Sequence, residues 1–538
     1  MKELLRDRTA IALLGFGLLF RGLIAALLPA GFDEAYYTAY VRYPNLSYFD
    51  HPLLVGWTVA MGAWWPDFPT PFSIRLGSLA LYTGTLIFLF LTADRLFGRR
   101  VARWTVAIAT VVPFFLVGFG VLVLPDSPLM FFWSACLWVC AQEFFGEETY
   151  RPTKRVVAIG ALVGLACLGK YHGFLLGAGL VLFCLLSAPH RRVFQSPWLI
   201  GAAVAFAVVL APLLIWNHQH EWVSFRFQGA RAVPEGGYRI GDLLLTFLVG
   251  NAYLFPTFGF PLWWTTGHQT WRWRLQPDGP QILWIACLSV PIFLGFTLMG
   301  GYRQILPSWP MPGFFTATLI LGRQVALAAA AHPQRVRRWW AGSTAVVALL
   351  LTVALLHVRF GLVQLLWPPA TDPSTQMLDV AQIRQAFREE PWAQALRNSD
   401  FVFSNNFFVA GQMVMALHPL TSQPITCFDT DLRGFAYWSQ AQDFVGKTGL
   451  YLTTALFENF DRRAIADLGR DGEPALSQEL LVQMNGETLP AVRVYERFFE
   501  RVETIGEIGL RRAGAVVQTV KVYRAIGLQR PYPRPYGL

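Results

Sequence analysis

Apolar runs long enough to cross a lipid bilayer recur along most of the chain, and they constrain its fold more than any other feature. From about Thr9 to His357, runs of roughly 17–25 mostly apolar residues follow one another, which is the length needed to span the hydrocarbon core. Charged residues make up only 14% of the chain, against about 25% in an average soluble domain. The sequence therefore predicts an all-α polytopic membrane protein with about eleven spanning helices.

After His357 the charge density rises and the long apolar runs end. DFVFSNN, PITCFD and AGAVVQTVKVYRAIG have the character of strands, and VAGQMVMALH that of an amphipathic helix. This boundary predicts a membrane domain over residues 1–358 and a C-terminal α/β domain over residues 359–538. The tail contains no nucleophile elbow, glycine-rich phosphate loop or metal-ligand spacing. We expect it to shape a substrate site or to be structural, and not to carry the catalysis.

The net charge of +10 comes from basic clusters in short turns between apolar runs, so it does not indicate nucleic-acid binding. The clusters occupy alternate turns, which the positive-inside rule assigns to the cytoplasm. This parity predicts a cytoplasmic N-terminus and an extracytoplasmic C-terminal domain. The clusters are Arg95 to Arg103, Arg151 to Arg155, Arg191 with Arg192, Arg272 with Arg274, and Arg335 to Arg338.

Nearly all polar side chains with catalytic potential fall in the turns expected on the other, outer face. Each has a structural alternative, because an acid before a helix can cap it and a lysine can extend to the lipid headgroups. Carboxylates suit the removal of a proton from an acceptor hydroxyl, and cations suit a phosphate leaving group. The residues are Asp33 and Glu34 with Tyr36 and Tyr37, Asp50 with His51, Asp126, Lys170 with His172, and Arg303.

Six segments resemble, in order, motifs of the C-type glycosyltransferases, specifically the dolichyl-phosphate-mannose protein mannosyltransferase-like family. They are FDEAYY, YFDHPLLVGW, LPDSPLMFFW, GKYHGFLL, WNHQHEWVSF and ILPSWPMP, and the similarity extends from about Leu13 to Phe315. That family includes the bacterial transferase that adds aminoarabinose to lipid A. The resemblance implies an inverting transfer of a sugar from a polyprenyl-phosphate donor. The acceptor would be lipid A or another envelope glycolipid or glycan, at the outer face of a bacterial plasma (inner) membrane.

The resemblance also implies roles for individual residues. Asp33 takes the principal catalytic position, Glu34 is the second acid of that motif, and Asp126 assists or positions the acceptor. His51 stands where the aminoarabinose transferases carry a lysine, and Leu53 replaces a proline, so the sugar and the acceptor stay open. The residues expected to contact the donor phosphate are Lys170, His51 and Arg303, with Tyr37 and His172 in the same pocket.

No cofactor is expected, and no set of metal ligands is evident, although a divalent metal is left open. The expected partners are the lipid-linked donor, a lipid or glycan acceptor and membrane lipids, with no nucleic acid. A protein O-glycosyltransferase is one alternative function. A flippase of lipid-linked sugars is another, but such transporters have internal repeats and midplane charges, which this sequence lacks. A non-catalytic lipid-binding scaffold is the third.

Overall fold

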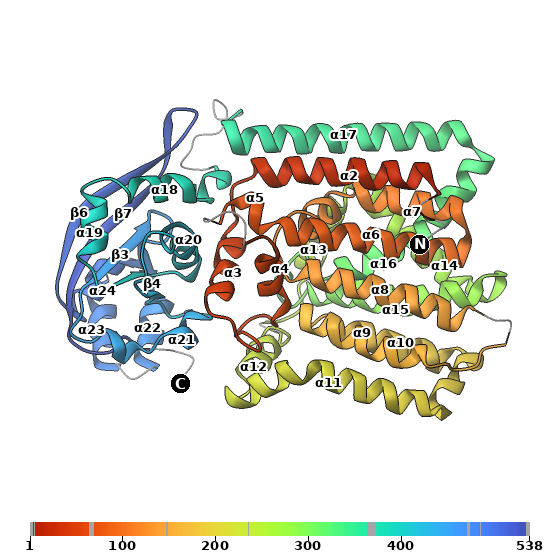
Figure 1. The fold of residues 1–538 in the computed structure, drawn as a ribbon, viewed down its shortest axis with the longest axis horizontal. Coiled ribbons are helices and arrows are strands. Elements are labelled where there is room, and N and C mark those ends of the chain that lie inside the picture. Colours follow the sequence, from red (N-terminus) through yellow and green to blue (C-terminus); the bar gives the residue numbers. More distant parts are fainter. Residues whose placement is uncertain are drawn as a thin grey trace.

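The chain folds into a bundle of long helices with a smaller sheet domain packed against one end of the bundle (Figure 1). The computed structural model describes residues 4, 6–63, 69–146, 149–234, 236–362, 372–470, 474–484 and 486–533. Local signals set the start of several helices: the Ser196 hydroxyl accepts a hydrogen bond from the backbone N–H of Trp198, and Pro197 fills the first helical position.

Among the described residues, six helical segments are long and apolar enough to cross a membrane, and up to eight if two bent pairs each count as one span. Shorter helices complete the bundle, so the predicted all-α polytopic class is confirmed and the predicted number of spans agrees roughly. The bundle helices are α2 (Arg8–Leu27), α6 (Leu76–Phe97), α7 (Arg99–Val111), α8 (Asp126–Phe144), α9 (Arg155–Gly169), α10 (Gly173–Leu186), α11 (Pro197–Gln219), α13 (Ile240–Leu254), α14 (Pro256–Trp271), α15 (Gly279–Met299), α16 (Met311–Ala331) and α17 (Pro333–Phe360).

Two predicted spans are interrupted. The span expected over about Leu243 to Trp264 is instead α13 and α14, and the helix direction bends by 113° between them. Pro256 has no N–H to continue the helix, and Phe255 before it has a left-handed φ of 65°, so the chain turns there. The third predicted span is α7 followed by the π-helix η1 (Phe115–Phe119). The predicted hairpin between α9 and α10 is present, with Lys170 at its tip.

A layer of short helices lies between the bundle and the C-terminal domain (Figure 1). These helices come from the segments that the sequence predicts as outer loops. They are α3 (Phe32–Arg42), α4 (Leu54–Ala63), α5 (Pro71–Ile74) and α12 (Val223–Ala230).

The C-terminal domain is built on a five-stranded sheet of order β2-β1-β3-β7-β6, which confirms the predicted α/β character. β1 (Phe401–Ser404) is parallel to β2 (Ile425–Cys427) and β3 (Gly449–Thr454), whereas β7 (Ala515–Leu528) is antiparallel to β3 and to β6 (Phe499–Arg512). Smaller elements complete the chain: η2 (Ala188–Gln195), η3 (Trp273–Leu275), η4 (Pro373–Gln376), α18 (Val380–Ala386), α19 (Trp392–Arg397), α20 (Phe407–Leu417), α21 (Phe435–Trp438), η5 (Ala441–Phe444), β4 (Asn459–Asp461), α22 (Arg462–Arg470), α23 (Pro474–Gln483), β5 (Thr488–Pro490) and α24 (Ala491–Tyr495).

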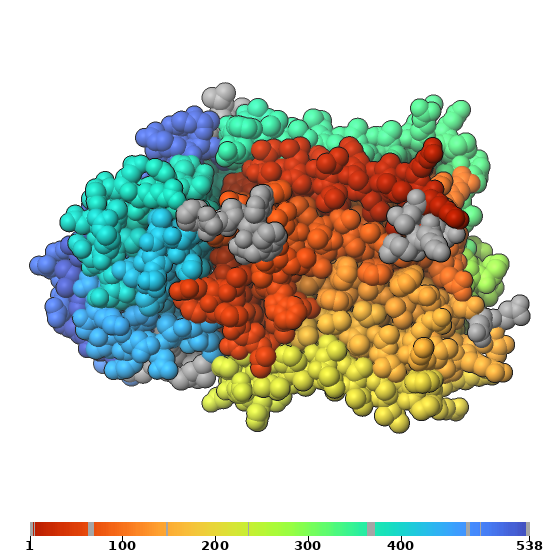
Figure 2. All heavy atoms as spheres, viewed as in Figure 1, coloured from red at the N-terminus to blue at the C-terminus, as the bar shows by residue number. Residues whose placement is uncertain are grey.

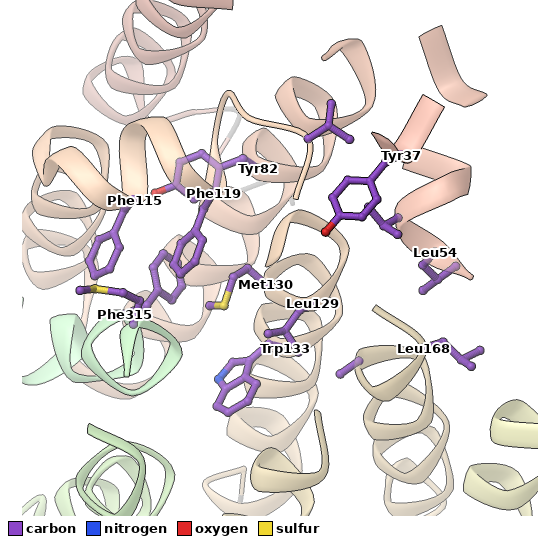
Figure 3. Packing of buried hydrophobic residues seen from close by; sticks show 14 of the residues in the cluster. Tyr37, Leu54, Tyr82, Phe115, Phe119, Leu129, Met130, Trp133, Leu168 and Phe315 are labelled. Carbon is purple, nitrogen blue, oxygen red and sulfur yellow. The ribbon is translucent and has the colours of Figure 1, made fainter. Parts of the chain in front are cut away.

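One continuous hydrophobic core joins the bundle to the short-helix layer. In Figure 3 the side chains of Met130 and Trp133 on α8 lie between a group of rings from α6, η1 and α16 and the residues Tyr37, Leu54 and Leu168. The indole N–H of Trp133 donates to the Thr316 hydroxyl at 3.0 Å, which satisfies its polar atom inside the bundle. The layer and the C-terminal domain also meet directly, and their surfaces adjoin in Figure 2. These contacts fix the position of α3, which carries Asp33.

Candidate active site

A cavity of about 660 Å³ lies where the bundle, the short-helix layer and the C-terminal domain meet. It is bounded by the start of α3, the loop before α4, the start of α8, the tip of the α9–α10 hairpin and α12. From the C-terminal domain, the start of α20 and the loop that carries Arg433 also line it. The cavity brings together six of the eight residues that the sequence predicts for the site: Asp33, Tyr37, His51, Asp126, Lys170 and His172.

Asp33 lies in the first turn of α3 with its side chain open to the cavity. Burial among protein atoms raises the pKa of Asp33 to about 6, and the negative charges of Asp50 and Glu34 act in the same direction. The positive charges of Arg433 and Lys170 oppose this rise. A carboxyl group with a pKa in this range can accept a proton near neutral pH, which is what a general base requires.

Glu34 does not line the cavity, although the sequence predicts it as the second acid of the site. Its carboxylate receives two hydrogen bonds from the fully buried Arg75, Nε at 2.7 Å and Nη2 at 2.5 Å. The backbone N–H groups of Gly31 and Val123 also donate to it, at 2.9 and 3.0 Å. With both oxygens occupied and the side chain 1% exposed, Glu34 holds α3 in place. This geometry fits a structural role and not the predicted catalytic one.

Asp126 and Lys170 form a buried ion pair in the cavity wall. The Nζ of Lys170 lies 2.9 Å from Oδ1 and 2.8 Å from Oδ2 of Asp126. Asp126 is the first residue of α8, and Lys170, 44 residues later, directly follows α9. The ion pair therefore joins these two helices. Removal of either partner would leave an uncompensated charge on a buried side chain.

Asp50 is a further carboxylate of the cavity, and each of its two oxygens has at least one donor nearby. The Tyr36 hydroxyl donates to Oδ1 at 3.3 Å, and the Tyr40 hydroxyl donates to the same oxygen. Nη1 of Arg433 lies 3.4 Å from Oδ2. The two tyrosines are on α3, so Asp50 connects the loop before α4 to the helix that carries Asp33.

His51 is a neutral member of the site at pH 7. Burial lowers the pKa of His51 to about 4, and the charges of Lys170, Arg433 and Arg231 add to this effect, while Asp50 opposes it. Its Nδ1 is buried and has no hydrogen-bond partner within the parts of the chain that the structure describes. His51 can therefore offer a hydrogen bond to a ligand, but it does not supply the positive charge of a lysine.

Arg303, the eighth predicted residue, lies outside this cavity. Its Nη1 donates to the backbone carbonyls of Ala230 at 3.2 Å and Val233 at 3.1 Å. It lines an adjoining pocket of about 400 Å³ together with Tyr238 and Tyr302. The structure therefore does not bring Arg303 to the main cavity, and in this position it holds the loop after α12.

Two arginines of the cavity, Arg231 and Arg433, were not predicted from the sequence. Arg231 follows α12 and has no ion-pair partner among the described residues, so its charge is available to a ligand. Its position in an outer loop beside other polar residues was the signal that could have found it. Arg433 comes from the C-terminal domain, and no local pattern in the sequence connects it with the membrane domain.

An apolar groove of about 350 Å³ extends from the cavity between α10 and α15. It shares Leu175, Phe296 and Met299 with the cavity, so the two spaces adjoin. Gly179 allows the close approach of the two helices, because a Cβ there would lie 2.8 Å from the Cys287 carbonyl oxygen. A ligand with a charged head and an apolar chain would fit a space of this kind.

No group of three His, Cys, Asp or Glu side chains within the described ranges is arranged to hold a metal ion. The charged groups that line the cavity are the carboxylates of Asp33, Asp50 and Asp126, the ammonium group of Lys170 and the guanidinium groups of Arg231 and Arg433.

Known proteins share both sequence and fold with this chain. Residues 50–216 match the family described as dolichyl-phosphate-mannose-protein mannosyltransferase. The fold resembles that of ArnT from Cupriavidus metallidurans in the apo state, at 13% identity and a TM-score of 0.58, covering 95% of this chain and 97% of that one. The same protein bound to undecaprenyl phosphate gives 14% identity and a TM-score of 0.57, with the same coverage.

The archaeal oligosaccharyltransferase AglB from Archaeoglobus fulgidus, in complex with an inhibitory peptide and a dolichol-phosphate, is more distant. It has 10% identity and a TM-score of 0.46, covering 88% of this chain and 68% of that one. No protein in a search of curated sequences matches. The family match and the ArnT likeness confirm the predicted resemblance and the predicted C-type glycosyltransferase fold. They also agree with the predicted kind of enzyme, a glycosyltransferase that uses a polyprenyl-phosphate sugar.

Proposed function

We propose that the protein is an inverting glycosyltransferase that moves a sugar from a polyprenyl-phosphate donor to lipid A or another glycolipid or glycan of the cell envelope. The observation that most supports this proposal is the cavity, which Asp33, Lys170 and Arg231 line together and which adjoins an apolar groove. The undecaprenyl phosphate in the ArnT structure supports the choice of donor. We further propose that the protein lies in a bacterial plasma membrane, with the cavity and residues 359–538 on the outer side.

The charges of the cavity suit the two ends of a displacement reaction. The acceptor oxygen attacks the anomeric carbon from the face opposite the phosphate, while the bond between that carbon and the phosphate oxygen breaks. The electron pair of that bond passes to the phosphate, and the acceptor proton passes to Asp33. Lys170 and Arg231 stabilise the negative charge that grows on the phosphate, because they are cations held in place before the reaction begins.

The remaining predicted residues have supporting places in this scheme. Asp126 holds Lys170 in position, and His51, Tyr37 and His172 line the same wall. The apolar groove between α10 and α15 offers the polyprenyl chain a path that stays inside the membrane part of the bundle. Glu34 and Arg303 are assigned to the framework around the site.

The test is sugar transfer by the purified protein in lipid vesicles, with Asp33→Asn compared with the unaltered chain. We expect transfer to fall by about 100-fold or more, the range typical of a lost general base. Asp242→Asn is the matched control, because Asp242 starts α13 in an exposed pair with Arg239. Full transfer by Asp33→Asn would exclude Asp33 as the base. Movement of the lipid-linked sugar across the vesicle without any transfer would instead identify a flippase, and a labelled peptide would identify a protein acceptor.

A further inference from the structure

Arg433 carries a charge of the C-terminal domain into the cavity of the membrane domain. It follows β2 in a loop and has a left-handed φ of 49°, a conformation that a residue with a Cβ adopts only when its surroundings hold it there. Asp431 supplies part of that hold, because Nε of Arg433 lies 3.0 Å from both of its carboxylate oxygens. The contact with Asp431 therefore fixes the direction of the Arg433 side chain.

The guanidinium group of Arg433 contacts two rings that belong to different domains. Its central carbon is 4.9 Å from the ring centre of Phe227 on α12 and 4.5 Å from that of Phe407 on α20. Beside it, the backbone N–H of Gly434 donates to the Tyr36 hydroxyl at 2.9 Å. Cation–π contacts use the faces of the guanidinium, so the N–H groups at its edge can still donate hydrogen bonds in the plane. Asp50 receives from this edge at 3.4 Å.

A second guanidinium group approaches the same ring. Arg231 lies 5.4 Å from the centre of Phe227, and both arginines line the cavity. Burial lowers the pKa of Arg231, and the charge of Arg433 lowers it further. The positive charges of the two arginines repel each other, and an anion bound between them would relieve this repulsion.

We propose that Arg433 and Arg231 together bind the phosphate of the lipid-linked donor, so that the donor site is completed by the C-terminal domain. This inference rests on the proposed function and names a binding residue in the tail, where the sequence indicated none. Guanidinium groups bind phosphate through paired N–H donors, and Arg433 has Nη donors beyond the Nε–H that Asp431 occupies. Because His51 is neutral at pH 7, other residues must supply the positive charge that faces the phosphate.

Binding of undecaprenyl phosphate to the full-length protein in detergent tests this directly, without the need for a sugar or an acceptor. We expect Arg433→Gln to weaken the affinity by about tenfold or more, in the range of a lost charged hydrogen bond, and Arg231→Gln to have a similar effect. Arg433→Lys keeps the charge but loses the planar fork, so its affinity should be intermediate. Arg226→Gln is the matched control: Arg226 is also on α12, but it is exposed and pairs with Glu221.

Because Arg433 contacts the buried Asp50, its removal also lowers stability, and a second variant separates the two effects. Asp431→Asn keeps the guanidinium group of Arg433 but removes the carboxylate that its Nε–H contacts. We therefore expect weaker binding of undecaprenyl phosphate, with an unfolding temperature close to that of the unaltered protein. Affinities of Arg433→Lys and Asp431→Asn equal to that of the unaltered protein would overturn the proposal and leave Arg433 as a structural contact. An unaltered protein that does not bind undecaprenyl phosphate would overturn the proposed function itself.

Discussion

At the scale of single residues, the environment of Asp33 predicts how the rate depends on pH. A general base must be deprotonated, and the pKa of Asp33 is about 6, so most of the protein is active at pH 7. Below pH 6 the protonated fraction grows, and kcat/KM should fall about tenfold for each further pH unit. Measurement of kcat/KM between pH 5 and 8 would check this, and a flat profile would contradict a base with this pKa.

Asp429 is the control for that experiment. Burial raises the pKa of Asp429 to about 7, so it titrates in the same range, but it does not line the cavity. Asp429→Asn should therefore keep the acidic limb of the profile. A limb that disappears with Asp429→Asn would assign the titration to the C-terminal domain.

The neighbours Asp33 and Glu34 show what could and could not be predicted from the sequence. Adjacent residues on a helix point about 100° apart, so one of two acids in a first turn faces away from the other. The sequence identified the pair by its chemistry, but the partner of Glu34 is Arg75, 41 residues away, and packing alone reveals it. Arg433 is a stronger case, because it meets Asp50 across 383 residues of chain.

At the scale of elements, the buried pair of Glu34 and Arg75 fixes α3 on the bundle. Arg75 also donates to the carbonyls of Ala25, Leu28 and Pro29 at the end of α2, so one side chain joins α2, α3 and α6. Glu34→Gln should lower the free energy of unfolding by about 3–5 kcal/mol, because it leaves a buried guanidinium without its counter-charge. The unfolding temperature in detergent measures this loss.

The comparison for that variant is Asp242→Asn, which breaks the exposed pair with Arg239 and should change the unfolding free energy by only about 0–1 kcal/mol. Equal effects from the two variants would contradict the structural role assigned to Glu34. If Glu34 were catalytic, Glu34→Gln would instead remove activity without a loss of stability.

The helices themselves were predictable where length and hydropathy decide them, and less so where a single residue breaks them. The hairpin at Lys170 was found because its apolar stretch is too long for one span. The turn at Phe255 was missed because the apolar pattern continues through it, although Pro256 has no backbone N–H with which to continue the helix.

At the scale of the whole molecule, the site depends on the close docking of two domains. Helix α20 of the C-terminal domain packs on α3, and Gly411 makes the contact possible, because a Cβ there would lie 2.6 Å from the Cα of Tyr36. The aromatic rings of Tyr43 and Trp438 stack across the same boundary at 5.2 Å. Sequence patterns describe each domain separately, so a cavity made by their contact could not be predicted from them.

The docking also makes the orientation of the whole protein testable, since the cavity and the C-terminal domain share one end of the bundle. Val482 is 84% exposed on α23 of that domain, and Trp271 is 91% exposed at the end of α14 beside the basic turn predicted as cytoplasmic. All six cysteines are buried, so the unaltered chain should react little with an impermeant maleimide. In spheroplasts we expect Val482→Cys to be labelled at once and Trp271→Cys only after permeabilisation. The reverse pattern would put the cavity on the cytoplasmic side and remove the basis for an outer-face transfer.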